Sequence, residues 1–178
     1  MNTTFFYALV LSVSNIVLSL VFFFIGYQTD KMAQGRWIVS LVPLAVMIVV
    51  TWLGLKAVRE EAKDKSLSYG KGVGTGVLIA LYASLIGGIY AYIHFTFINP
   101  NFADYAIDMI RQKWVAAGMG DNQMEQAEKF TRFFYKPAVM AVMNVPVGTF
   151  FGTVFSLILS IFLKRKPAAT VEDAPAAV

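Results

Sequence analysis

Four long stretches of the chain contain mainly hydrophobic residues and no Asp, Glu, Lys or Arg. They cover residues 1–29, 37–55, 72–103 and 137–163. About 20 apolar residues are enough for a helix to cross the hydrocarbon core of a bilayer. The pattern therefore predicts an all-α integral membrane protein. We place its four transmembrane helices at about residues 4–27, 37–55, 73–98 and 137–163.

Small residues recur at every fourth position of the third stretch, and a second series follows in the fourth stretch. The first series is Gly72, Gly76, Ala80, Ser84 and Gly88, and the second is Gly148, Gly152, Ser156 and Ser160. Residues four apart lie on one face of a helix. Small side chains on that face let the backbone of another helix come close. The two series predict that the third and fourth transmembrane helices pack closely against each other.

Polar and helix-breaking residues interrupt the hydrophobic stretches at a few positions. Ser12, Asn15 and Ser19 share one face of the first predicted helix. An Asn in lipid is expected to turn toward neighbouring helices, and we interpret Asn15 as one partner of an interhelical hydrogen bond. A second Asn, Asn144, lies in the fourth stretch. Pro43 and Pro146 lie inside the second and fourth predicted helices, where each removes a backbone hydrogen bond and favours a kink.

Residues 99–136 separate the third and fourth stretches and predict a helical hairpin outside the membrane. Asn99 and Pro100 are typical of a helix start. Gly118–Gly120 predicts the turn, and Asn122 with Glu125 resembles a capping box that opens a second helix. The segment has five basic and five acidic residues. Because helices on anionic membranes are usually rich in Lys and Arg, we expect the hairpin to cap its own bundle or bind a protein partner.

The distribution of Lys and Arg predicts the orientation of the chain. Residues 56–71 contain five basic residues in a short loop, and Lys164–Lys166 follows the last hydrophobic stretch. Basic residues favour the cytoplasmic side, so both termini are expected inside and the hairpin outside. Residues 1–166 form one predicted membrane domain, and the Pro- and Ala-rich residues 167–178 form a predicted disordered tail.

Composition agrees with a membrane protein and excludes several kinds of site. Hydrophobic residues make up 57% of the chain and charged residues 15%, against about 25% charged in soluble domains. There is no cysteine, which excludes disulfides, thiolate metal sites and cysteine nucleophiles. The net charge of +4 comes from short loops beside the predicted helices, so nucleic acid is not an expected partner.

His94 is the only histidine, and it lies among aromatic residues near the end of the third predicted helix. We interpret it as a polar anchor at the membrane interface, because one imidazole cannot form a metal site alone. Asp104 and Asp108 are the only nearby carboxylates, and we expect them to be solvated charges on a helix face. We therefore predict no catalytic residue, no cofactor and no metal site. If the protein were an enzyme, these three residues would be its candidate acid–base groups.

Two parts of the chain resemble an uncharacterised bacterial family of four-helix membrane proteins, domain of unknown function 4199. The first part is Arg59–Glu61 followed by Ser66–Gly72 and a glycine-bearing helix. The second is Tyr135–Pro137, then Pro146–Gly148, and a helix that ends at Lys164–Lys166. The resemblance covers nearly the whole chain. It implies a protein of the inner membrane of a Gram-negative bacterium, and it implies no reaction.

Three functions are compatible with this pattern. The first, which we favour, is a non-enzymatic accessory, assembly or scaffold protein that meets a partner through the hairpin. The second is a small transporter or channel acting as a homo-oligomer, indicated by two proline-containing helices and by Asn15 and Asn144. The third, a membrane enzyme, lacks an evident catalytic constellation. A continuous polar cavity would favour transport, and a sealed bundle would favour a scaffold.

Overall fold

The computed structural model describes residues 2–165, and the predicted tail at 167–178 lies outside them. The described residues form six α-helices and one π-helix, with no strand. The elements are α1 (Thr3–Phe24), α2 (Met32–Glu61), α3 (Tyr69–Ile93), η1 (His94–Ile98), α4 (Phe102–Ala116), α5 (Asp121–Phe134) and α6 (Pro137–Leu163). Helices α1, α2 and α6, together with α3 continued by η1, are long and apolar enough to cross a membrane.

The helix boundaries differ from the predicted ones where backbone caps lie in polar segments. Helix α2 begins at Met32 instead of Trp37 and continues past Leu55 to Glu61. Helix α3 begins at Tyr69, because the Oγ of Ser68 accepts a hydrogen bond from the N–H of Lys71. Hydrophobicity alone marks the part of a helix that fits a membrane, whereas capping decides where the helix itself ends.

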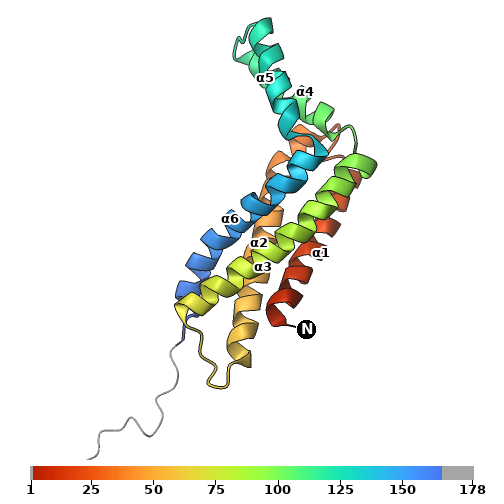
Figure 1. The fold of residues 1–178 in the computed structure, drawn as a ribbon. Helices are drawn as coiled ribbons and strands as arrows, with labels where there is room; N and C mark the ends of the chain where they lie inside the picture. Colours follow the sequence, from red (N-terminus) through yellow and green to blue (C-terminus); the bar gives the residue numbers. More distant parts are fainter. Residues whose placement is uncertain (1, 166–178) are drawn as a thin grey trace, which may run out of the picture.

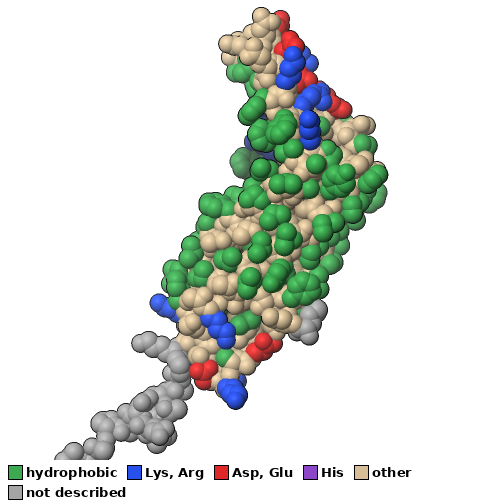
Figure 2. Space-filling model, in the orientation of Figure 1, with side chains coloured by type: hydrophobic (Ala, Val, Ile, Leu, Met, Phe, Trp, Pro, Cys, Tyr) green, Lys and Arg blue, Asp and Glu red, His purple; other side chains and the backbone are tan. Residues whose placement is uncertain are grey.

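The four long helices form an elongated bundle, and the α4–α5 hairpin projects from one end of it (Figure 1). The start of α1, the loop between α2 and α3, and the end of α6 lie together at the opposite end. On the face drawn in Figure 2, hydrophobic side chains cover the bundle, and charged side chains gather at its two ends. This distribution suits a bundle whose middle faces lipid.

Helices α3 and α6 touch along the two series of small residues, as the sequence predicted. Adding a Cβ to Gly72 would place it 2.7 Å from the Oγ of Ser160, and one added to Gly76 would collide with Ser156. Three further contacts continue the same alignment along the two antiparallel helices: Ala80 with Gly152, Ser84 with Gly148, and Gly88 with Ala141. The spacing of the two backbones therefore depends on the lack of side-chain bulk at these positions.

Apolar side chains fill the half of the bundle nearest the start of α1. Ala8, Leu11, Val50, Ile79 and Ala83 form one buried cluster contributed by α1, α2 and α3. A second cluster, Leu55, Leu67 and Leu163, closes the end of the bundle. There the backbones of Leu67 and Arg165 exchange two hydrogen bonds of 3.0 Å. This half has the dense interior that helix packing requires.

The hairpin is a pair of amphipathic helices joined by an ion pair between their side chains. Arg132 on α5 donates to Asp104 on α4 at 2.7 Å and to Glu128 at 3.0 Å. The hydrogen bonds to Asp104 and then Glu128 raise the pKa of Arg132. The predicted capping box at Asn122 is wrong. Helix α5 begins at Asp121, and the side chain of Gln123 accepts from the N–H of Gly120.

Replacing Gly88 by Ala should lower the free energy of unfolding by about 1–3 kcal/mol, the usual cost of overpacking. The added Cβ would lie 2.7 Å from the carbonyl oxygen of Ala141, which is backbone and cannot rotate away. Gly74 is a matched control on the same helix, since nothing lies within 4 Å of its Cβ position. Gly74→Ala should leave stability unchanged or raised. Equal thermal unfolding of the two variants in detergent would contradict the proposed contact.

Candidate functional site

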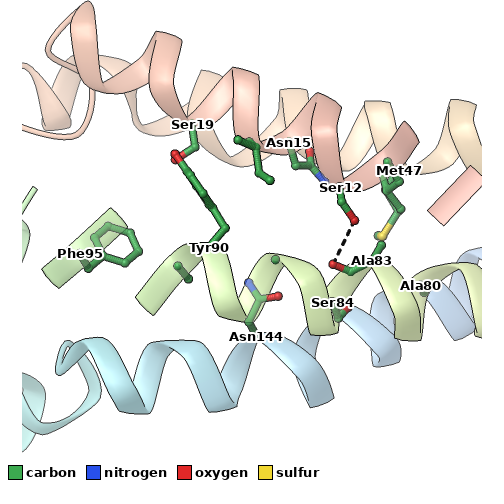
Figure 3. A pocket seen from close by; sticks show the side chains of 15 residues that line it. Ser12, Asn15, Ser19, Met47, Ala80, Ala83, Ser84, Tyr90, Phe95 and Asn144 are labelled. Carbon is green, nitrogen blue, oxygen red and sulfur yellow. Dashed lines mark hydrogen bonds between the residues drawn. The ribbon is translucent and has the colours of Figure 1, made fainter. Parts of the chain in front are cut away.

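A cavity of about 310 Å³ lies in the other half of the bundle, between α1, α3 and α6. Figure 3 views it with α1 and α6 on either side of α3. Met47 of α2 and Phe95 of η1 also contribute to its wall. The cavity is not continuous through the bundle, because the apolar cluster around Ile79 occupies the opposite half. Its volume is at the small end of the range for ligand pockets.

Polar side chains from three helices line this cavity. Ser12, Asn15 and Ser19 come from α1, and they share one face as their spacing predicted. Ser84 and Tyr90 come from α3, and Asn144 comes from α6. The described lining residues include no Asp, Glu, Lys or Arg. The cavity therefore has uncharged hydrogen-bonding groups within a mainly apolar lining (Figure 3).

Asn15 does not form the interhelical hydrogen bond that the sequence predicted. Its Oδ1 is buried and has no hydrogen-bond partner among the described residues. Ser12, three residues earlier, does reach a neighbouring helix: its Oγ donates to the carbonyl of Ala8 at 2.8 Å and approaches that of Ala83 at 3.4 Å. A buried acceptor without a donor is costly. Among the three polar residues of this face, Asn15 is thus the one whose side-chain oxygen has no hydrogen-bond partner within the described residues.

A chain of hydrogen bonds borders the cavity at the end nearest the hairpin, and it begins at Gln28 in the loop after α1. The Gln28 Nε2 lies 3.2 Å from both the backbone carbonyl and the Oγ of Ser19. A carbonyl can only accept, so the amide nitrogen of Gln28 must face Ser19. Its Oε1 then faces the Nε2 of His94, at 2.8 Å. The orientation of this amide determines the rest of the chain.

His94 must carry its proton on Nε2, because Gln28 offers that nitrogen only an acceptor. The neutral ring then presents Nδ1 as an acceptor, and the hydroxyl of Tyr90 donates to it at 2.9 Å. Tyr90 and Ser19 both line the cavity, and Figure 3 shows the ring of Tyr90 extending from α3 toward Ser19. The hydrogen-bond chain therefore starts and ends at the same cavity, so it orients groups and does not connect two sides of the bundle.

The structure places His94 differently from the predicted interfacial anchor. Its side chain is 0% exposed, and it packs edge-on against Phe23 and Phe95. It opens the π-helix η1, in which the N–H of Asn99 donates to the carbonyl of His94 at 2.7 Å. π-helical turns occur frequently at functional sites. The signal available in the sequence was a polar residue in an aromatic run, and nothing local indicated that Gln28 was its partner.

The position of Asn99 before Pro100 predicted that Asn99 caps α4, and this prediction is wrong. The helix begins at Phe102, after Asn101. Asn99 is 3% exposed, and its Nδ2 donates to the backbone carbonyl of Gln28 at 3.1 Å. Tertiary contact has replaced the local capping role. Asn99 and His94 together hold Gln28, one through its backbone and the other through its side chain.

The structure does not bring His94 together with Asp104 and Asp108. His94 binds Gln28 and Tyr90, and Asp104 binds Arg132 on the hairpin. Asp108 is exposed on α4. Within residues 2–165 no group of three or more His, Asp or Glu side chains is placed to hold a metal ion. The residues to which we assigned a possible acid–base role therefore do not form one site.

Phe95 separates the cavity from two crevices at the base of the hairpin. It lines the cavity and also both crevices, whose volumes are about 260 and 280 Å³. Its ring lies 4.5 Å from that of Phe102, centroid to centroid. Tyr135 lines both crevices, and burial raises the pKa of its hydroxyl. The hairpin base therefore packs around the side chain that closes this end of the cavity.

The fold and the cavity define a class, an all-helical protein with four helices suited to a membrane and a polar cavity among them. The family described as "Protein of unknown function (DUF4199)" matches residues 6–165. The chain belongs to this family, as its resemblance indicated. The comparisons with curated proteins and with solved structures gave no match.

Replacing Asn15 by Leu should raise the free energy of unfolding by about 1 kcal/mol, because it removes a buried acceptor that lacks a donor. Ser12→Ala, on the same face of α1, should lower it, because Ser12 makes the hydrogen bonds that Asn15 lacks. Thermal unfolding in detergent measures both. A loss of stability in Asn15→Leu equal to that in Ser12→Ala would mean that Asn15 is part of the structural framework.

Proposed function

We propose that the protein crosses a bacterial inner membrane four times, through α1, α2, α3 with η1, and α6. The support is the length and apolar composition of these helices and the gathering of charged residues at the two ends of the bundle. The five basic residues of 56–71 favour the cytoplasm for that loop and for both termini. The hairpin then lies on the periplasmic side, and the lipid bilayer is the first partner of the chain.

The function that the geometry supports best is the binding of a small uncharged molecule. The observation that carries this proposal is the polar cavity between α1, α3 and α6. Ser12, Asn15 and Tyr90 are among the uncharged hydrogen-bonding side chains that line it. The cavity ends at the apolar cluster around Ile79. The cavity is therefore a closed-ended site and not the continuous polar path that would favour a channel or transporter.

Binding without catalysis is the mode of action we propose. Tyr90, His94 and Gln28 resemble a nucleophile with an oriented base. However, a tyrosine that attacks a substrate needs positive charge nearby to stabilise the developing anion. The described lining of the cavity offers uncharged amides and hydroxyls instead. These groups suit recognition of a neutral molecule better than chemistry on it.

An accessory role remains the second candidate, and one feature of the hairpin favours it. Phe130 is 69% exposed, and Val115 and Phe133 are also exposed, so this aromatic surface is not covered by the bundle. A protein partner bound there would shield it from water. A homo-oligomer formed through the outer helix faces is compatible with either function.

A cysteine at position 15 should react readily with a small uncharged reagent such as N-ethylmaleimide. The natural chain has no cysteine, so each introduced thiol reports on one position. Asn15 lines the cavity, whereas Ser156 is 0% exposed between α3 and α6 and serves as the control. We expect Asn15→Cys to react about tenfold faster or more than Ser156→Cys, because thiol reactivity follows access. Equal rates in lipid nanodiscs would rule out an accessible cavity and the proposed function.

The proposed orientation predicts that Ser66→Cys and Asn122→Cys label from opposite sides of the membrane. Ser66 belongs to the basic loop before α3, and Asn122 is exposed on the hairpin. A membrane-impermeant maleimide applied to right-side-out vesicles should modify Asn122→Cys, and it should modify Ser66→Cys only after permeabilisation. Modification of both sites before permeabilisation would contradict the four-span topology.

A further inference from the structure

We infer that the second half of α5 lies on the bilayer surface, with Phe130, Phe133 and Phe134 inserted among the lipids at the hairpin end of the bundle. The partner of this helix face is thus the lipid interface. The inference rests on the proposed four crossings of the membrane and does not depend on the cavity. It follows from the exposure of the three rings, the distribution of charge around α5, and the contacts that join the hairpin to η1.

The three aromatic rings form one uncovered patch on α5. Phe130 is 69% exposed, Phe133 50% and Phe134 43%. The ring of Phe134 lies 5.0 Å from that of Phe130 and 5.5 Å from that of Phe133, centroid to centroid, so the patch is continuous. An exposed apolar patch of this kind marks contact with a protein or with a membrane.

The charged side chains of α5 lie on the opposite side of the helix from the patch. Glu128 and Arg132 are each two residues from Phe130, which places them about 160° away around the helix. On the patch side, the residues four and seven positions before Phe130 are the uncharged Gln126 and Gln123. Charged side chains follow one edge of the hairpin, and hydrophobic ones follow the edge toward which the hairpin bends (Figures 1 and 2). Helix α5 is therefore amphipathic in the way of a helix that lies in a membrane interface.

Contacts at the base of the hairpin place the end of α5 beside the membrane-spanning part of the chain. The ring of Tyr135, which follows α5, lies 5.8 Å from that of Phe102, and Phe102 lies 4.5 Å from Phe95 of η1. Helix η1 completes the third membrane-spanning segment, and its Phe97 is 73% exposed. The patch on α5 thus adjoins the surface that the bundle presents to lipid, which favours the bilayer over a protein as its cover.

The chain connection supplies what the hairpin lacks in charge. The hairpin segment has as many acidic as basic residues, so it is not attracted to anionic lipid as free surface helices are. Helix α5 does not need that attraction, because Pro137 opens α6 three residues after Phe134 and keeps α5 at the bilayer. The Nζ of Lys136 lies 5.4 Å from the centre of the Phe133 ring. Its stem can cover the ring while the amine reaches the lipid head groups.

Three single-cysteine variants test the inference through their rates of reaction with a charged, membrane-impermeant maleimide. The protein is held in nanodiscs with one copy each, so neither a second copy nor another protein is present. Phe97→Cys reports on a lipid-facing position, Phe130→Cys on the patch, and Lys129→Cys on the water-facing side of the same turn of α5. The natural residues Phe97 and Phe130 are 73% and 69% exposed, and the Lys129 side chain is 74% exposed, so the chain itself shields none of them.

We expect Phe130→Cys to react at least about tenfold more slowly than Lys129→Cys, because thiol reactivity depends on access to water and on the thiolate form. Its rate should resemble that of Phe97→Cys. Lys129 is a matched control, since its ion pair with Glu125 is exposed and its loss costs little stability. A nitroxide on the same cysteines gives a second readout. At position 130 it should collide more often with oxygen, which dissolves in lipid, than with a water-soluble nickel complex, and at position 129 the reverse.

Equal rates for Phe130→Cys and Lys129→Cys beside a slow Phe97→Cys would overturn the inference and leave the proposed membrane crossing intact. A fast reaction of Phe97→Cys would instead contradict the crossing itself, and the inference with it. Protection of Phe130→Cys in native membranes but not in nanodiscs would also overturn the inference, because it would assign the patch to a protein partner, as the accessory role requires.

Discussion

The close contact between α3 and α6 is the constraint on which the rest of the bundle depends. Small residues at every fourth position let the two backbones approach so far that even a methyl group on Gly76 or Gly152 would collide with the opposite helix. In lipid, such contacts replace the hydrophobic effect as the force that joins helices. With α3 and α6 fixed together, α1 packs on α3 over the apolar half through Ala8 and Leu11 and meets η1 at the other end through Phe23. The other half is left with space.

The polar groups around that space are of two kinds, those with hydrogen-bond partners and those without. Gln28, His94 and Tyr90 satisfy one another in a chain with a single possible direction. Asn15 lines the same space, and its Oδ1 is buried without a partner among the described residues. Buried polar groups normally have partners, and Thr51 and Ser160 in the packed half of the bundle are further exceptions. The protein thus combines a rigid polar frame with uncharged side chains that line the cavity, which is the arrangement expected of a preorganised binding site.

The sequence predicted those features that repeat along one helix. The fourfold spacing of Gly72, Gly76 and Ala80 and the shared face of Ser12 and Asn15 each needed only the geometry of a single helix. The contact between α3 and α6 was predicted because both helices carry a repeat, whereas a contact between two single residues was out of reach: Gln28 and His94 are 66 positions apart. The local rule at Asn99 failed for the same reason, because its side chain holds the backbone of Gln28 in place of a helix end. The cavity could not be predicted either, because it depends on how the side chains of three helices pack in space.

The π-helical turn η1 holds one residue more than an α-helical turn would, because its closing bond joins His94 to Asn99, five positions on. Each residue of an α-helix advances the direction of the chain by about 100°. The extra residue therefore lets His94 face Gln28 while the chain beyond it is aimed toward the hairpin. Insertions and deletions are usually tolerated at the ends of helices. Here the loss of a single residue would change the direction in which the chain leaves η1, so the length of this turn determines the position of α4.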